Sequence, residues 1–221
     1  MMSAMSTLTG REIAAAGLVD WSLLGAGMQT RLLTGTYATG LRLLAAIGAA
    51  AEAADHHPDL DLRYAHLDVR LSSHDVGGVT QRDLSLARAV SDLAAAEGVG
   101  ATPGVATLLE LALDSPDPDV VRPFWRVVLG MREVQPPGSA PELRDDVLPT
   151  LWFQQSGDDE PRQRFHVDLW VAPEVVEVRI AAAVAAGGVL VSDADAPAFW
   201  VLADPEGNRV CLCTWQDRDA V

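Results

Sequence analysis

The sequence predicts an α+β protein in two parts, an antiparallel sheet with helices followed by two paired βαβββ modules. Helix-period and strand-period apolar patterns alternate through residues 1–98, and glycine and proline then interrupt the helical pattern over residues 95–107. Beyond the interruption the order strand, helix and three strands occurs twice, which indicates a repeated structural unit. We therefore expect a first domain over residues 1–98, a linker over 99–106 and a second domain over 107–221.

The composition limits the classes of function. The chain has 221 residues and is 49% hydrophobic, which allows a sizeable core in each of two domains. All 16 basic residues are arginine, so there is no lysine for Schiff-base chemistry or for a phosphate-binding P-loop. The formal net charge of −15 disfavours the basic patch that nucleic acid requires, and we expect no nucleic-acid partner.

The sequence also predicts a reducing, aqueous environment. The two cysteines, Cys211 and Cys213, lie two residues apart, which in a strand places both on one face and poorly for a mutual disulfide. The N-terminus lacks a basic segment followed by an apolar run, and no stretch reaches the roughly 20 apolar residues of a membrane span. We expect a cytoplasmic protein with no membrane partner.

Two helices are predicted before the first strand pair. Residues 9–16 have the pattern of a short helix. An alanine-rich helix begins at about Ala38 and ends at His57, because Pro58 disfavours helical backbone at the residue before it. Its apolar stripe is predicted at Leu41, Leu44, Ala45 and Gly48, with Glu52 next on the same face.

A strand and a third helix complete the first part. Leu67, Val69 and Leu71 alternate with polar residues, as in a strand with one buried face. After a glycine-containing turn, a helix follows Thr80 as its N-cap, with Asp83 at the capping-box position.

One spaced set of residues has a specific resemblance. The pattern E-x3-H-H-P-x5-Y-x9-H-x8-D is formed by Glu52, His56, His57, Pro58, Tyr64, His74 and Asp83. It resembles the signature of the pterin-4a-carbinolamine dehydratases at each of these positions. The resemblance covers residues 8–97, with Trp21 where the family has a tryptophan and Ser73 where threonine is usual.

This resemblance implies an enzyme, a 4a-hydroxytetrahydrobiopterin dehydratase, with a small-molecule pterin as its partner and with no cofactor or metal. The family eliminates water from a 4a-hydroxytetrahydropterin to give the quinonoid dihydropterin. The leaving hydroxide must gain a proton and a ring nitrogen must lose one, and imidazoles suit both steps. A helix C-terminus also stabilises a cationic histidine, which makes either residue of the adjacent pair a candidate for the acid. The expected catalytic residues are His56, His57 and His74, and the expected substrate-binding residues are Glu52, Pro58 and Asp83.

Several of these residues have a plainer interpretation. A Thr-x-x-Asp capping box explains Asp83 without catalysis. Glu52, one turn before His56, either orients that histidine or is merely solvated. Tyr64 is expected to be structural, and a zinc site is disfavoured because adjacent histidines rarely bind one metal.

Chain geometry adds a prediction about the segment between the histidines. If His57 and His74 act on one pterin they must lie close together, whereas a straight strand of that length would separate them by roughly 55 Å at about 3.3 Å per residue. The chain must therefore turn back, and we expect a hairpin with its tip near residues 64–66. Leu60–Arg63 should then pair antiparallel with Leu67–Arg70.

Residues 107–216 resemble the glyoxalase/bleomycin-resistance superfamily, the vicinal-oxygen-chelate proteins. The segments "DSPDPDVVRPFWRVVLGM", "FHVDLWV" and "LADPEGNRVCLC" carry the resemblance, and the last contains a D-P-x-G-N turn ending at Asn208. Active members hold a divalent metal, commonly with histidine and glutamate ligands. The corresponding positions fall at or near Glu110, His166 and Cys211, with Gln154 as the nearest fourth candidate. Because this is not an ordinary hard-metal donor set, we expect a metal-free domain.

The predicted function is therefore dehydration of a 4a-hydroxytetrahydropterin, with a glyoxalase-like accessory or ligand-binding domain. Trp152, Trp170 and Trp200 either line an aromatic pocket in that domain or pack in its core. Two alternatives stay open: a non-catalytic binding or interaction protein, and a metal-dependent glyoxalase or dioxygenase activity in the C-terminal half. Assembly into a homo-oligomer also stays open.

Overall fold

The computed structural model describes residues 6–136, 139–157, 165–185, 187–203 and 209–218. The chain divides into two compact units, one formed by Met1–Ala106 with Trp215–Val221 and the other by Thr107–Thr214. Each unit has its own sheet and its own hydrophobic core, so the predicted α+β class is confirmed. Within the described ranges, no helix combines the length and apolar character needed to cross a membrane.

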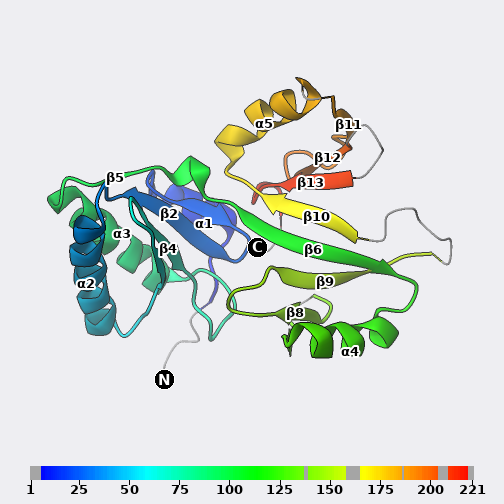
Figure 1. Ribbon diagram of the computed structural model, residues 1–221, viewed down its shortest axis with the longest axis horizontal. Helices are drawn as coiled ribbons and strands as arrows, with labels where there is room; N and C mark the ends of the chain where they lie inside the picture. The colour runs from blue at the N-terminus through cyan, green and yellow to red at the C-terminus, as the bar shows by residue number, and fades with distance from the viewer. Residues whose placement is uncertain (1–5, 137–138, 158–164, 186, 204–208, 219–221) are drawn as a thin grey trace. The chain divides into compact units, whose positions relative to one another are not determined.

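The N-terminal unit is an antiparallel sheet with helices, as the sequence predicts. Its strands lie in the order β1-β2-β4-β3, and β5 also pairs with β2. Helices α2 and α3 lie beside each other (Figure 1). The elements of this unit are α1 (Gly10–Ala15), β1 (Ser22–Leu24), β2 (Gly27–Leu33), α2 (Tyr37–Ala54), β3 (Asp59–Leu62), β4 (Leu67–Leu71), α3 (Gln81–Ala96) and β5 (Gly100–Ala101).

The core of this unit includes residues from α2 and β4. The predicted alternation is confirmed, since β4 buries Leu67, Val69 and Leu71. The predicted helix stripe is wrong by one residue, because Leu41 is 48% exposed and the buried residues are Gly40, Leu43, Ile47 and Ala51. Alanine and glycine make several faces of α2 apolar, so periodicity alone did not identify the buried one. Packing against α3 and β3 decides it, and Gly40 on the buried face lies against the Leu62 side chain.

The predicted end of α2 at His57 is also wrong. The helix ends at Ala54, because Asp55 adopts the left-handed conformation with φ 47° and ψ 42°. The His56 N–H then donates to the Ala51 carbonyl at 3.1 Å. This is a Schellman-type helix end in which aspartate occupies the position where glycine is commonest. His56 and His57 therefore lie beyond the helix.

The chain between His57 and His74 turns back as predicted. β3 and β4 pair antiparallel, with Leu60 opposite Val69 and Leu62 opposite Leu67. The Arg63 N–H donates to the His66 carbonyl at 2.9 Å and closes the turn. The hairpin prediction is thus confirmed, but its register is shifted by one residue throughout, because Asp59–Leu62 and not Leu60–Arg63 pairs with Leu67–Arg70.

The segment expected to link the domains belongs to the N-terminal unit. Gly100 and Ala101 pair with β2, and the Thr102 N–H donates to the Arg31 carbonyl at 2.8 Å. The chain also returns to this unit after the second one, because Trp215 packs against the N-terminal core. Trp215 lies so close to Gly10 that a Cβ there would be 2.7 Å from the indole ring. The N-terminal unit is therefore completed by residues from the far end of the chain.

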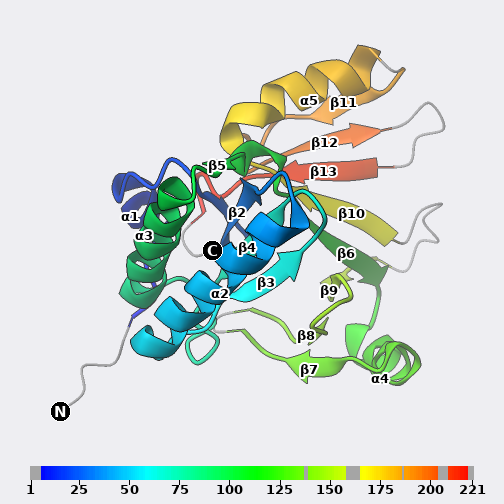
Figure 2. The same cartoon turned by 60° about the vertical axis from the view of Figure 1, so that its left-hand side comes forward.

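The C-terminal unit contains the two βαβββ modules that the sequence predicts. Its eight strands form one mixed sheet in the order β11-β12-β13-β10-β6-β9-β8-β7 (Figure 2). The first strands of the modules, β6 and β10, pair antiparallel. The modules comprise β6 (Leu108–Ser115), α4 (Pro118–Leu129), β7 (Arg132–Val134), β8 (Glu142–Arg144), β9 (Thr150–Gln155), and then β10 (Phe165–Trp170), α5 (Pro173–Ala185), β11 (Val189–Ser192), β12 (Phe199–Ala203) and β13 (Arg209–Cys213). The predicted turn ending at Asn208 lies outside the described residues.

Candidate functional site

The adjacent residues His56 and His57 lie in different environments. His56 is 7% exposed, and its Nε2 lies 2.7 Å from Oδ1 of Asp83. The side chain of His57 is 57% exposed, and its Nε2 lies 3.2 Å from Oε1 of Glu52. One histidine is therefore buried and its neighbour is accessible.

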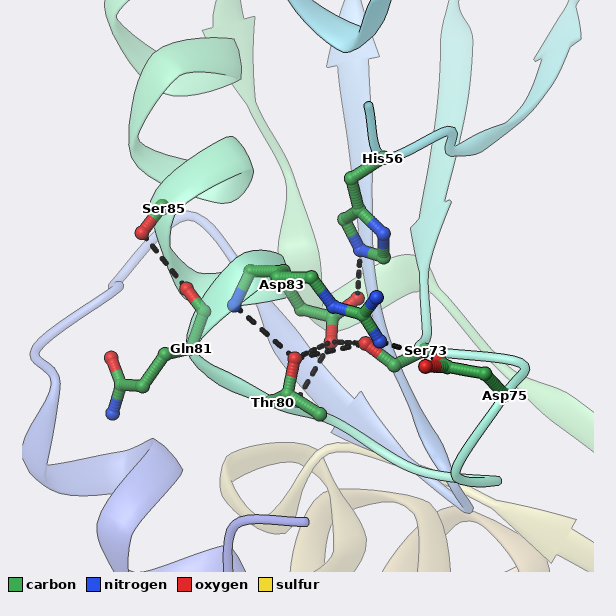
Figure 3. A network of polar contacts seen from close by, with 8 residues as sticks. His56, Ser73, Asp75, Thr80, Gln81, Asp83 and Ser85 are labelled. Atoms are coloured by element: carbon green, nitrogen blue, oxygen red, sulfur yellow. Dashed lines mark hydrogen bonds and ion pairs between the residues drawn. The ribbon is translucent and has the colours of Figure 1, made fainter. Parts of the chain in front are cut away.

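Asp83 is the buried centre of a polar network (Figure 3). Its Oδ2 accepts hydrogen bonds from the Ser73 hydroxyl at 2.7 Å, from the Thr80 N–H at 2.7 Å and from the Thr80 hydroxyl at 3.2 Å. A carboxylate accepts hydrogen bonds and does not donate them, so the His56 Nε2–H is the donor to Oδ1. The buried charge is thus hydrogen-bonded through both oxygens, as burial requires.

This single carboxylate anchors both chain segments that bear exposed histidines. His56 immediately precedes His57, and Ser73 immediately precedes His74, which is also exposed. Each exposed histidine is therefore one residue away from a hydrogen bond to Asp83. The arrangement connects the end of α2 to the loop between β4 and α3.

The loop that carries His74 folds around Ser73. The Ser73 carbonyl accepts from the N–H groups of Val76 and Gly77 at 3.2 and 2.9 Å, and the Ser73 N–H donates to the Gly78 carbonyl at 2.8 Å. Gly77 has a φ of 69°, which glycine adopts without steric cost. The backbone of the loop is consequently fixed close to its start, while the His74 side chain remains exposed.

The structure also places the other predicted site residues, and it corrects the expected partner of Glu52. Glu52 contacts His57 and not His56, because α2 ends before the histidines and the helical i,i+4 relation does not reach them. Pro58 is half-buried and directly precedes β3, and Tyr64 lies at the hairpin tip with 75% exposure.

The second predicted set of residues lies on one face of the eight-stranded sheet. The register places Glu110 opposite Asp168, and Asp168 beside Cys211. His166 shares this face because it lies two residues from Asp168 on β10. Its Nδ1 is 3.3 Å from Oδ1 of Asp114, and its Nε2 is 3.7 Å from Oδ1 of Asp168.

These residues do not fit the metal site that the glyoxalase-like fold implies. Both ring nitrogens of His166 face carboxylates, and Oε2 of Glu110 accepts the Trp170 indole N–H at 2.9 Å. Cys211 offers sulfur where a hard cation prefers oxygen. Gln154, the fourth candidate, pairs in register with Asp114 on β6. Among the described residues, no group of three or more histidine, cysteine, aspartate or glutamate side chains is arranged to hold a metal ion.

The three tryptophans of this unit have different surroundings. Trp200 is 7% exposed and belongs to the hydrophobic core, so the core interpretation is right for this residue. Trp170 is equally buried and donates to Glu110. Trp152 is half-buried, and its ring lies edge-on to His166 with the centroids 5.3 Å apart.

Burial raises the pKa of Glu110 above that of an ordinary glutamate. The hydrogen bond from Trp170 opposes this rise in pKa, and the nearby carboxylates of Glu142 and Asp168 add to it. The ionised form of Glu110 is therefore disfavoured in the folded protein.

Comparison with known proteins agrees with both expected families. The family described as pterin 4 alpha carbinolamine dehydratase matches residues 6–93, and the family described as glyoxalase-like domain matches residues 110–213. A Nocardia farcinica protein, provisionally named a pterin-4-alpha-carbinolamine dehydratase, is 36% identical over 89 residues, which are 39% of this chain and 94% of that relative.

Two solved structures are each similar to part of the chain. A transcriptional coactivator/pterin dehydratase from Brucella melitensis is 29% identical, with 40% of this chain and 99% of that one covered at a TM-score of 0.39. A glyoxalase/bleomycin resistance protein/dioxygenase superfamily member from Vibrio splendidus is 17% identical, with 49% and 99% covered at a TM-score of 0.34.

The matched family and the Nocardia relative assign the N-terminal unit. The chain belongs to the pterin-4a-carbinolamine dehydratase family through residues 6–93, and it carries a glyoxalase-like domain over residues 110–213.

Sequence reasoning missed four residues of the two sites. Ser73 was noted only as a departure from the usual threonine, and Thr80 only as a helix cap, yet both bond to Asp83. Their positions in the sequence were the available signal. Ser73 directly precedes His74, and in a capping box the residue at the position of Thr80 hydrogen-bonds the residue at the position of Asp83. Asp114 and Asp168 were also missed, although period-two alternation places them on the face of Glu110 and His166.

Replacing Asp83 with alanine is expected to lower the free energy of unfolding of the N-terminal unit by about 3–5 kcal/mol, because the His56 ring and the Ser73 and Thr80 donors would lose their buried acceptor. Urea unfolding followed by backbone amide signals of this unit measures the change. Asp92→Ala, at an exposed position of the same helix, is the matched control and should change stability by less than about 0.5 kcal/mol. A loss below about 1 kcal/mol for Asp83→Ala would contradict the network's importance.

The raised pKa of Glu110 predicts a pH dependence in the C-terminal unit. Between the ordinary glutamate pKa and the raised one, the folded state binds more protons than the unfolded state, so stability falls as pH rises through that window. Glu110→Gln keeps an acceptor for the Trp170 indole and should remove this fall, which leaves the variant more stable than wild type at pH 7. Urea unfolding across pH tests this, with the exposed Glu177→Gln as control. An unchanged pH profile in Glu110→Gln would refute it.

Proposed function

We propose that the N-terminal unit dehydrates a 4a-hydroxytetrahydropterin to the quinonoid dihydropterin by histidine acid/base catalysis. The observation that carries this proposal is the Asp83 carboxylate, which hydrogen-bonds His56 through one oxygen and Ser73 through the other. These bonds fix the chain positions immediately before His57 and His74. Family membership of residues 6–93 supports the same reaction.

We assign proton transfer to His57 and His74, because both side chains are exposed and both are held by anchored neighbours. The reaction breaks the bond between C4a and its hydroxyl, which leaves as water after gaining a proton from one imidazolium. The ring nitrogen beside C4a loses its proton to a neutral imidazole as the carbon–nitrogen double bond forms. The two histidines return to their starting states by exchanging a proton with solvent or with each other.

The remaining residues act through these two histidines. His56 is buried and its Nε2 is occupied by Asp83, so we assign it a positioning role. Asp83 is wholly buried and acts in the same way, without touching the substrate. Glu52 lies 3.2 Å from His57 Nε2 and orients that ring, while Pro58 restricts the backbone directly after it.

For the glyoxalase-like unit we propose an accessory or ligand-binding role without a bound metal. The support is the donor set, in which His166 faces two carboxylates and Glu110 is hydrogen-bonded to an indole. A metal would have to displace these interactions and accept Cys211 where oxygen is preferred.

Removing either exposed histidine should abolish most of the dehydration. His57→Ala and His74→Ala are each expected to lower kcat for a synthetic 4a-hydroxytetrahydropterin by about 10²–10⁴-fold, because each removes one positioned acid or base. Turnover is measured as the absorbance change on formation of the quinonoid product.

His66→Ala is the matched control for these variants. His66 is a half-buried histidine of the same unit, at the hairpin turn, and it lies outside the family signature. This variant should retain the wild-type rate. Wild-type turnover in both His57→Ala and His74→Ala would refute the catalytic assignment, and absence of turnover in the wild-type protein would favour a non-catalytic binding function.

The C-terminal unit should bind no metal stoichiometrically. Elemental analysis of protein purified without chelator is expected to find nickel, zinc, iron and manganese each far below one atom per chain. One atom per chain that is lost in His166→Ala would show that a metal-dependent reaction belongs to this unit.

A further inference from the structure

His74 has an anchored residue on each side of it in the chain. On one side, the Ser73 hydroxyl donates to Asp83. On the other side, the Asp75 carboxylate accepts a hydrogen bond from Nη2 of Arg82 and forms an ion pair with it. Arg82 and Asp83 are consecutive residues in the first turn of α3. Two neighbouring side chains of one helical turn therefore hold the chain before and after His74.

The contact between Arg82 and Asp75 joins two partly exposed side chains. The Arg82 side chain is 27% exposed and the Asp75 side chain 59% exposed. The hydrogen bond from the guanidinium holds the pKa of Asp75 below its usual value. The backbone N–H of Arg82 is used separately, since it donates to the Thr80 hydroxyl at 3.2 Å. Side-chain substitutions at Arg82 therefore leave the helix cap in place.

We propose that Arg82 and Asp75 form a positioning pair that fixes the His74 imidazole for proton transfer, an inference that rests on the dehydration proposed above. The hydrogen bonds of Ser73 hold the loop at its start and at residues 76–78, on either side of the two residues His74 and Asp75. The pair adds a side-chain contact between α3 and Asp75, the residue directly after His74. The pair acts by aligning the His74 imidazole. It adds little to the free energy of unfolding, because partly exposed ion pairs contribute little to stability.

This role predicts a specific kinetic change. Arg82→Gln and Asp75→Asn should each lower kcat by roughly 10- to 100-fold with little change in KM, because a small misplacement of a catalytic group slows the reaction without preventing substrate binding. Arg82→Lys keeps the charge and should recover part of the loss. Arg88→Gln is the matched control, since Arg88 is an exposed arginine of the same helix whose guanidinium hydrogen-bonds the Leu84 carbonyl. The control should have wild-type kcat.

Combining Arg82→Gln with each histidine variant distinguishes a loss of His74 alignment from general damage to the fold. If Arg82 acts through His74, adding Arg82→Gln to His74→Ala should lower kcat no further, whereas adding it to His57→Ala should lower kcat again. Equal losses in both backgrounds would overturn the proposal, because they would show an effect that does not pass through His74.

Hydrogen exchange tests the pair independently of any activity. The amides of Val76 and Gly77, which donate to the Ser73 carbonyl, should exchange at least several-fold faster in Arg82→Gln than in wild type, while the amides of α3 beyond its first turn are unchanged. Unchanged exchange at these amides would overturn the pair's positioning role. A wild-type protein without dehydratase activity but with this exchange pattern would instead refute the proposed reaction and leave the anchoring of the loop supported.

Discussion

The buried carboxylate of Asp83 is the constraint on which the N-terminal unit depends. A charge removed from water is tolerated only where donors surround it, and here the donors come from three separate places in the chain: His56 beyond α2, Ser73 at the end of β4, and Thr80 at the start of α3. A conformation that separates these segments removes hydrogen-bond donors from the buried charge, which is costly. The need to solvate one aspartate with protein groups thus fixes the relative positions of the two segments that bear exposed histidines.

This dependence means that the helix cap and the site are one structure. Thr80 and Asp83 form a capping box of a kind found at many helix starts, and the box uses only part of the carboxylate's capacity. The remaining capacity accepts His56 and Ser73. An ordinary local motif has therefore become the support of a site without a change in its own geometry. A role of Asp83 in the helix cap and the proposed role in positioning the histidines are therefore compatible.

Patterns that depend on local chemistry were predicted correctly from the sequence. The hairpin followed from the length of chain between two histidines expected to act on one substrate, and the capping box followed from two residues at fixed spacing. The failures occurred where tertiary packing decides. Alanine-rich α2 has several apolar faces, and its packing against α3 and β3 selects one. The left-handed Asp55 ends the helix before Pro58 can act, and this moved Glu52 from His56 to His57. The contacts of Ser73 likewise needed the folded chain, because the partners lie on different elements.

The return of Trp215 to the N-terminal core has a consequence for biosynthesis. A ribosome makes the chain from its N-terminus, so the whole glyoxalase-like unit is synthesised before the indole that covers Gly10 exists. The dehydratase-like unit must wait with that part of its surface uncovered until the segment that contains Trp215 has left the ribosome. The packing of Trp215 against the N-terminal core can therefore occur only after the second unit has been synthesised. The final folding step of one domain thus depends on the synthesis of the other.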